Sequence, residues 1–109
     1  MFVVMNRFKI NEGKEDAFEG AWKTRESHLH TFEGFQHFAL LKNDTAADGT
    51  VEYISHTIWG SRQNFENWRN SQEFVRAHSG AQVEGVIAGP PHASLYEAVI
   101  EESNAKVTA

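Results

Sequence analysis

The start of the chain alternates apolar and polar positions. The even positions of residues 2–10 are apolar apart from Asn6, whereas Arg7 and Lys9 stand at odd positions. A two-residue period is typical of a β-strand with one buried face, because successive side chains point to opposite sides. We therefore expect a first strand over Phe2–Ile10, with Asn6 on its apolar side.

The period becomes helical after a break at Asn11-Glu12-Gly13. Apolar residues between Ala17 and Trp22 recur at helical spacing, with charged residues between them. One apolar stripe on a charged segment predicts an amphipathic helix, here from Lys14 to about Leu29.

Other segments combine apolar and aromatic residues with turn signals at their ends. We expect strands over Phe35–Lys42, Val51–Trp59 and His92–Ile100, the first of them after a turn at Glu33-Gly34 and before a polar loop at Asn43–Gly49.

A short helix should follow the third strand. Ser61 can cap it, and Phe65 and Trp68 lie three residues apart, so that they share one face.

Ser71 can cap a further helical piece. Phe74, Val75 and His78 stand at positions i, i+1 and i+4 and are expected on one side of it. The glycines and prolines of Ser79–Pro91 then predict a mobile connection to the last strand.

The order strand, helix, strand, strand, helix, strand predicts an α+β, ferredoxin-like fold with an antiparallel sheet covered on one face by helices. Its first strand is apolar on both faces, since Val3 and Met5 oppose Val4 and Phe8. A second copy packed sheet on sheet would hide the surplus, so we expect a homodimer of the α/β barrel type. Residues 1–109 are expected to form one domain, with a flexible tail from about 102 onward.

The composition of the chain limits the classes of partner, metal ligand and cellular location that we expect. The chain has 10 basic and 15 acidic residues, a net charge of −5 at pH 7, and no basic stripe, so we expect no nucleic-acid partner. It has no cysteine, which leaves histidine as the expected ligand for any iron. No segment is apolar enough for a signal peptide or a bilayer span, so we expect a cytoplasmic protein without a membrane partner.

The candidate chemistry centres on Trp68 and His78. An indole and an imidazole beside a glycine-containing loop suggest a pocket for a flat, metal-bearing ligand. Asn6 adds a carboxamide on an apolar face, where an unpaired amide costs roughly 1–3 kcal/mol. It either bonds to nearby backbone or lines a pocket. The other histidines are interpreted as surface or packing residues, and no phosphate loop, serine elbow or carboxylate pair is present, which leaves redox chemistry or binding.

The chain resembles the antibiotic biosynthesis monooxygenase (ABM) superfamily and, within it, the small IsdG-type haem-degrading monooxygenases. The resemblance covers most of the chain and rests on these segments: Asn6–Gly13, Phe32–Phe35, Trp59-Gly60-Ser61 with Asn67-Trp68, and Phe74–His78.

The resemblance implies that Asn6, Trp68 and His78 form a haem pocket and are the catalytic residues. His78 would bind the iron, Asn6 would act on the oxygen side and Trp68 would press the porphyrin out of plane. Haem would be cofactor and substrate at once, opened with O2 and electrons from an external reductase or small reductant to give a bilin-type product and free iron. The alternatives are a cofactor-free quinol-type monooxygenase of the same superfamily and a haem-binding or storage protein without turnover.

Overall fold

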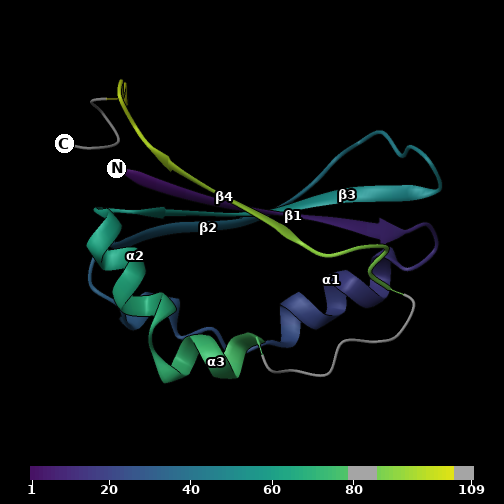
Figure 1. Cartoon of the computed structure of the whole chain (residues 1–109), viewed down its shortest axis with the longest axis horizontal. Helices are drawn as coiled ribbons and strands as arrows, with labels where there is room; N and C mark the ends of the chain where they lie inside the picture. The colour runs from purple at the N-terminus through teal and green to yellow at the C-terminus, as the bar shows by residue number, and fades with distance from the viewer. Residues whose placement is uncertain (79–85, 105–109) are drawn as a thin grey trace.

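The computed structural model describes residues 1–78 and 86–104, of which 76–78 are described by their backbone alone. In this part of the chain the elements are, in order, β1 (Phe2–Asn11), α1 (Glu15–Thr24), the 3-10 turn η1 (Leu29–Thr31), β2 (Phe35–Lys42), β3 (Thr50–Trp59), α2 (Arg62–Arg69), α3 (Gln72–His78) and β4 (His92–Glu97). The helices lie on one face of the sheet, giving two layers (Figure 1). Within the described ranges, no helix has the length and apolar character needed to cross a membrane.

The sheet has the strand order β2-β3-β1-β4, and every neighbouring pair is antiparallel. This is the α+β, ferredoxin-like arrangement that the sequence predicts. The register confirms the apolar side of β1: Phe2, Phe8 and Ile10 are buried, whereas Arg7 and Lys9 are exposed.

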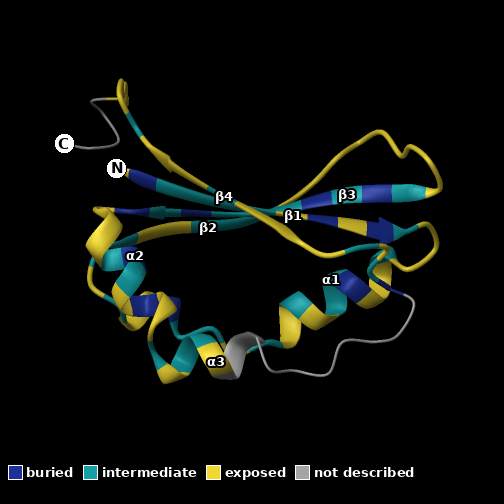
Figure 2. Ribbon diagram, viewed as in Figure 1, coloured by how far each residue is buried: buried dark blue, intermediate teal, exposed yellow. Residues whose placement is uncertain are grey.

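Two hydrophobic clusters fill the space between the sheet and the helices, and Figure 2 shows buried segments on the strands and on α1 and α2. The first, which we call the α1 cluster, consists of Phe8, Ile10, Phe18, Val51, Tyr53 and Val86. The second, which we call the α2 cluster, consists of Phe2, Leu29, Trp59, Phe65 and Trp68. Strand β1 contributes Phe2 to the α2 cluster and Phe8 and Ile10 to the α1 cluster, and Asn6 lies between them.

The first helix is shorter than predicted. It ends at Thr24, and Arg25 is already extended, with φ −72° and ψ 148°. The Thr24 hydroxyl donates to the carbonyl oxygen of Gly20 at 3.0 Å, in the last turn. Leu29 is 3 % exposed and belongs to the α2 cluster, so the chain leaves the helix to bring Leu29 under the other part of the sheet.

Two further predictions from apolar residue type are wrong. The last strand ends at Glu97, which pairs with Phe2, the first residue of β1, and beyond it the Ala98 N–H donates to the Met1 carbonyl oxygen at 2.9 Å. Val99 and Ile100 beyond it are 91 % and 82 % exposed. Val75 is 62 % exposed and does not share the buried side with Phe74, because adjacent helical residues are about 100° apart.

The connection before β4 is fixed where the structure describes it. The backbone N–H of Asn11 donates to the carbonyl oxygen of Val86 at 3.0 Å, and the backbone N–H of Ala88 donates to the carbonyl oxygen of Lys9 at 2.8 Å. Val86 is 5 % exposed. This part pairs with the edge of β1 that β4 leaves free, the mobility of the connection stays a prediction, and residues 79–85 lie outside the described residues.

Candidate functional site

Asn6 lies on the middle of β1 and faces the helices. Its register neighbours are Ser55 on β3 and Ala93 on β4, and Ser55 in turn lies opposite Leu40 on β2. This cross-strand row, Leu40–Ser55–Asn6–Ala93, is hereafter called the polar row. It separates the α1 cluster from the α2 cluster and carries short or polar side chains at its centre.

The amide oxygen of Asn6 is buried and has no hydrogen-bond partner among the described residues. Of the two interpretations that the sequence left open, this favours a side chain that lines a pocket, because a backbone donor does not satisfy the oxygen. A buried unpaired acceptor costs about 1–3 kcal/mol. The site therefore offers an acceptor to a donor that is not part of this chain's described residues.

Trp68 belongs to α2, whose start is set by the predicted serine cap. The backbone N–H of Asn64 donates to the Ser61 hydroxyl oxygen at 3.2 Å. The Trp68 ring is 6 % exposed and lies 5.7 Å from the Trp59 ring at an interplanar angle of 33°. Strand β3 thus supports the ring from behind.

Helix α3 is joined to Trp68 through a second ring. Phe74 packs edge-on against Trp68, with ring centroids 4.8 Å apart and an angle of 87°. The predicted cap of α3 is present, since the Phe74 N–H donates to the Ser71 hydroxyl oxygen at 3.1 Å, and that hydroxyl donates to the Trp68 carbonyl at 2.5 Å. His78 is the last residue of α3, but its side chain lies outside the described residues, so its role as ligand stays a prediction.

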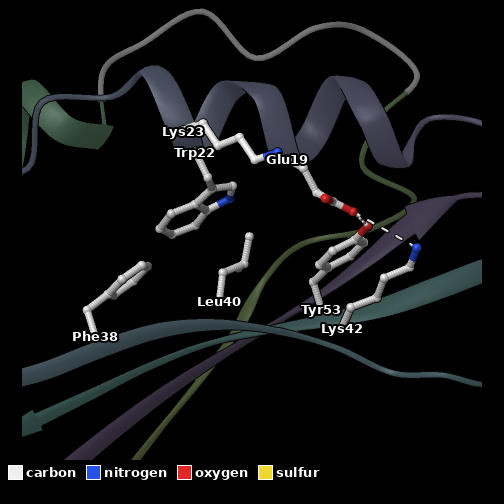
Figure 3. Close-up of a pocket in the computed structure, with 7 residues that line it drawn as sticks. All are labelled: Glu19, Trp22, Lys23, Phe38, Leu40, Lys42 and Tyr53. Carbon is white, nitrogen blue, oxygen red and sulfur yellow. Dashed lines mark hydrogen bonds and ion pairs between the residues drawn. The ribbon is translucent and has the colours of Figure 1, made fainter.

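An open cavity of about 350 Å³ lies between α1 and strands β2 and β3 (Figure 3). Its lining residues are Glu19, Trp22, Lys23, Phe38, Leu40, Lys42 and Tyr53. Trp22 and Phe38 stack with centroids 5.6 Å apart at 20° and so connect the two clusters. The Arg25 guanidinium lies 4.4 Å from the Trp22 ring centroid and 5.0 Å from that of Phe38, and burial lowers its pKa.

One wall of this cavity carries a hydrogen-bonded phenol. The Tyr53 hydroxyl donates to the Glu19 carboxylate at 2.5 Å, and the Lys42 ammonium lies 4.0 Å from the same oxygen (Figure 3). Burial, followed by the hydrogen bond and charge of Glu19, raises the pKa of Tyr53. The phenol therefore stays protonated at neutral pH.

The structure places two of the predicted residues and adds others. Asn6 and Trp68 both lie between the sheet and the helices, whereas the cavity between α1 and β2 was not predicted. Trp22 and Phe38 are aromatic residues of two predicted elements, and they are the residues from which the cavity could have been predicted. Their contact was not predictable, because it joins residues that are distant in the sequence. Among the side chains of residues 1–75 and 86–104, no three histidine, aspartate or glutamate groups are placed to hold a metal ion.

Comparison with known proteins defines the class. The family model described as antibiotic biosynthesis monooxygenase matches residues 1–80, and the chain belongs to that family. A "Heme oxygenase (staphylobilin-producing)" of Staphylococcus saprophyticus is 32 % identical to it over 80 residues, which are 73 % of this chain and 75 % of that protein.

Solved structures of two kinds share the fold. MhuD of Mycobacterium tuberculosis, described as a heme-degrader with two hemes bound in its active site, has a TM-score of 0.70 at 24 % identity and covers 94 % of this chain and 100 % of its own. A mutant of SnoaB, a cofactor-independent oxygenase of Streptomyces nogalater, has a TM-score of 0.67 at 16 % identity, covering 92 % and 94 %. Both likenesses establish the ferredoxin-like fold alone.

Proposed function

We propose that this protein is a haem-degrading monooxygenase that opens the porphyrin ring with O2 and electrons from an external reductant. The observation that carries the proposal is the unpartnered, buried amide oxygen of Asn6 on an aromatic-lined face of the sheet. The 32 % identity to a heme oxygenase supports it. Haem would be substrate and cofactor, and its products would be a bilin and free iron.

The residues of the chain fit such a ligand. Haem, when bound, would supply the iron at which O2 is activated. His78 at the end of α3 would hold the iron, and Asn6 would hydrogen-bond to the small ligand that the iron binds. Trp68 would press on the porphyrin plane, and it can resist displacement because Trp59 and Phe74 support its ring.

The cavity between α1 and β2 supports a ligand with an apolar body and acidic groups. Trp22 and Phe38 give aromatic walls, and Lys23 and Lys42 add ammonium groups at its lining. The Arg25 guanidinium lies against the same two rings. In a chain of net charge −5, these cations provide a local positive potential that would suit two propionate groups.

Titration of the purified protein with hemin tests the proposal. The Soret band should shift on binding, and addition of ascorbate or a reductase should make it decay while a ferrous chelator detects released iron. His78→Ala should abolish this decay and keep the fold by circular dichroism. His92→Ala, an exposed position on β4, serves as control and should degrade haem at the wild-type rate.

The other outcomes identify the alternatives. Absence of hemin binding would contradict the proposal and favour a cofactor-free oxygenase, which the same fold supports in SnoaB. A Soret band that persists under reductant would indicate a haem-binding or storage protein. Haem degradation by His78→Ala at the wild-type rate would show that the iron ligand is a different residue.

We also propose that the outer face of the sheet pairs with a second copy of the chain. The side chains that alternate with the buried ones include the apolar Val3 and Met5 on β1 and Ile54 and Ile58 on β3, with Arg7 and His56 beside them on the same face. Ile54→Asp should convert a dimer to a monomer in sedimentation velocity, and Ala17→Asp on exposed α1 should not. A monomeric wild-type protein would refute this pairing.

A further inference from the structure

The polar row holds a second polar side chain besides Asn6. Ser55 lies on β3 directly opposite Asn6 and shares its face of the sheet. The neighbouring inward positions of β3, Tyr53 and Thr57, are buried, whereas Ser55 is half-buried. This inward position of β3 thus carries a side chain that is smaller than its two buried neighbours.

The two side chains are complementary. Directly opposite residues of an antiparallel pair have Cβ atoms about 4.5–5.5 Å apart, so a small ligand can touch both side chains. The Ser55 hydroxyl can donate one hydrogen bond and accept others, whereas the Asn6 oxygen is an acceptor without a partner. A species of one or two heavy atoms, such as water or an O2-sized ligand, can therefore accept from Ser55 and, when it carries a hydrogen, donate to Asn6.

We infer that Ser55 is a further ligand-contacting residue of the oxygen side, and that with Asn6 it holds the small ligand above the sheet. This inference rests on the proposed function, because the small ligand is the one that haem would present to the polar row. Ala93 and Leu40 complete the row without polar side-chain atoms, so Ser55 is the hydroxyl nearest to Asn6 within it. On either side of the polar row lie the α1 cluster and the α2 cluster.

Azide binding to the ferric haem complex provides a readout that does not depend on turnover. Azide accepts hydrogen bonds, and loss of one such bond should weaken its affinity about 3- to 10-fold. We expect this loss in Ser55→Ala, with hemin affinity unchanged, and affinity close to wild type in Ser55→Thr, which keeps a hydroxyl. Ser94→Ala is the matched control, since Ser94 lies opposite Met5 on the outer face and should leave azide binding unchanged.

The outcomes separate this inference from the function on which it rests. If Ser55→Ala bound hemin and azide as the wild type does, the role of Ser55 would be refuted and the haem site would stand. If the wild-type protein did not bind hemin, both would be refuted. A fall in azide affinity in Ser94→Ala equal to that in Ser55→Ala would indicate a general effect on the sheet and would also overturn the assignment.

Discussion

Replacement of Asn6 by leucine should make the protein more stable and inactive. Leucine has the same branched arrangement of heavy atoms as asparagine but brings no polar atom, and the Asn6 oxygen is buried without a hydrogen-bond partner among the described residues. Relief of that unpaired acceptor should raise the free energy of unfolding by about 1–3 kcal/mol. For a domain of roughly 100 residues, each kcal/mol corresponds to about 4–8 °C in Tm. Haem turnover should be lost because the oxygen side loses its carboxamide.

Differential scanning calorimetry at one fixed protein concentration measures the stability change, since the proposed dimer would make Tm depend on concentration. Asn67→Leu is the matched control: Asn67 is exposed on α2 and accepts a hydrogen bond from Gln63 at 2.8 Å, so this substitution should not stabilise the protein. A Tm for Asn6→Leu at or below the wild-type value would refute the reasoning, because it would mean that the amide oxygen is satisfied in the folded protein.

Gly34→Ala should be more destabilising in urea denaturation than Gly13→Ala. Both glycines have positive φ, which costs a residue with a side chain about 1–2 kcal/mol. A Cβ at Gly34 would also lie 2.2 Å from the Asn64 side chain, whereas a Cβ at Gly13 would meet open space. Equal losses of stability in the two variants would refute the packing argument. Tyr53→Phe should lose less stability than wild type as pH rises above about 10. Burial and Glu19 raise the pKa of Tyr53 in the folded protein, so above this pH the folded wild type keeps a proton that the unfolded chain releases, and the wild type is destabilised. Chemical denaturation at a series of alkaline pH values checks this, and identical pH profiles would contradict it.

The sequence predicts local structure well where one physical cause dominates. The alternation in β1 and the serine caps at Ser61 and Ser71 depend on neighbouring residues only, and all three are confirmed. The end of α1 depends instead on where Leu29 finds a cluster, and the end of β4 depends on where β1 begins. These are tertiary constraints, which periodicity along one segment does not contain.

The candidate site shows the same division. The exceptional position of Asn6 is visible as a polar residue in an apolar alternation, but its pairing with Ser55 requires the register of two strands. The hydrogen bond between Tyr53 and Glu19 joins residues 34 positions apart and has no local signal. The predicted roles of Trp68 and His78 and the single domain over residues 1–109 stay predictions, since they concern a ligand and side chains beyond those described.

The placement of the tryptophans gives the protein separate optical reporters. Trp59 and Trp68 lie 5.7 Å apart, close enough for their excited states to couple and to produce a near-ultraviolet dichroism that depends on the packing of α2 against the sheet. Trp22 lies elsewhere, stacked on Phe38 beneath the Arg25 guanidinium. The dichroism of the pair therefore reports on the side of the polar row that carries α2, whereas Trp22 responds to the contact of α1 with β2 on the other side.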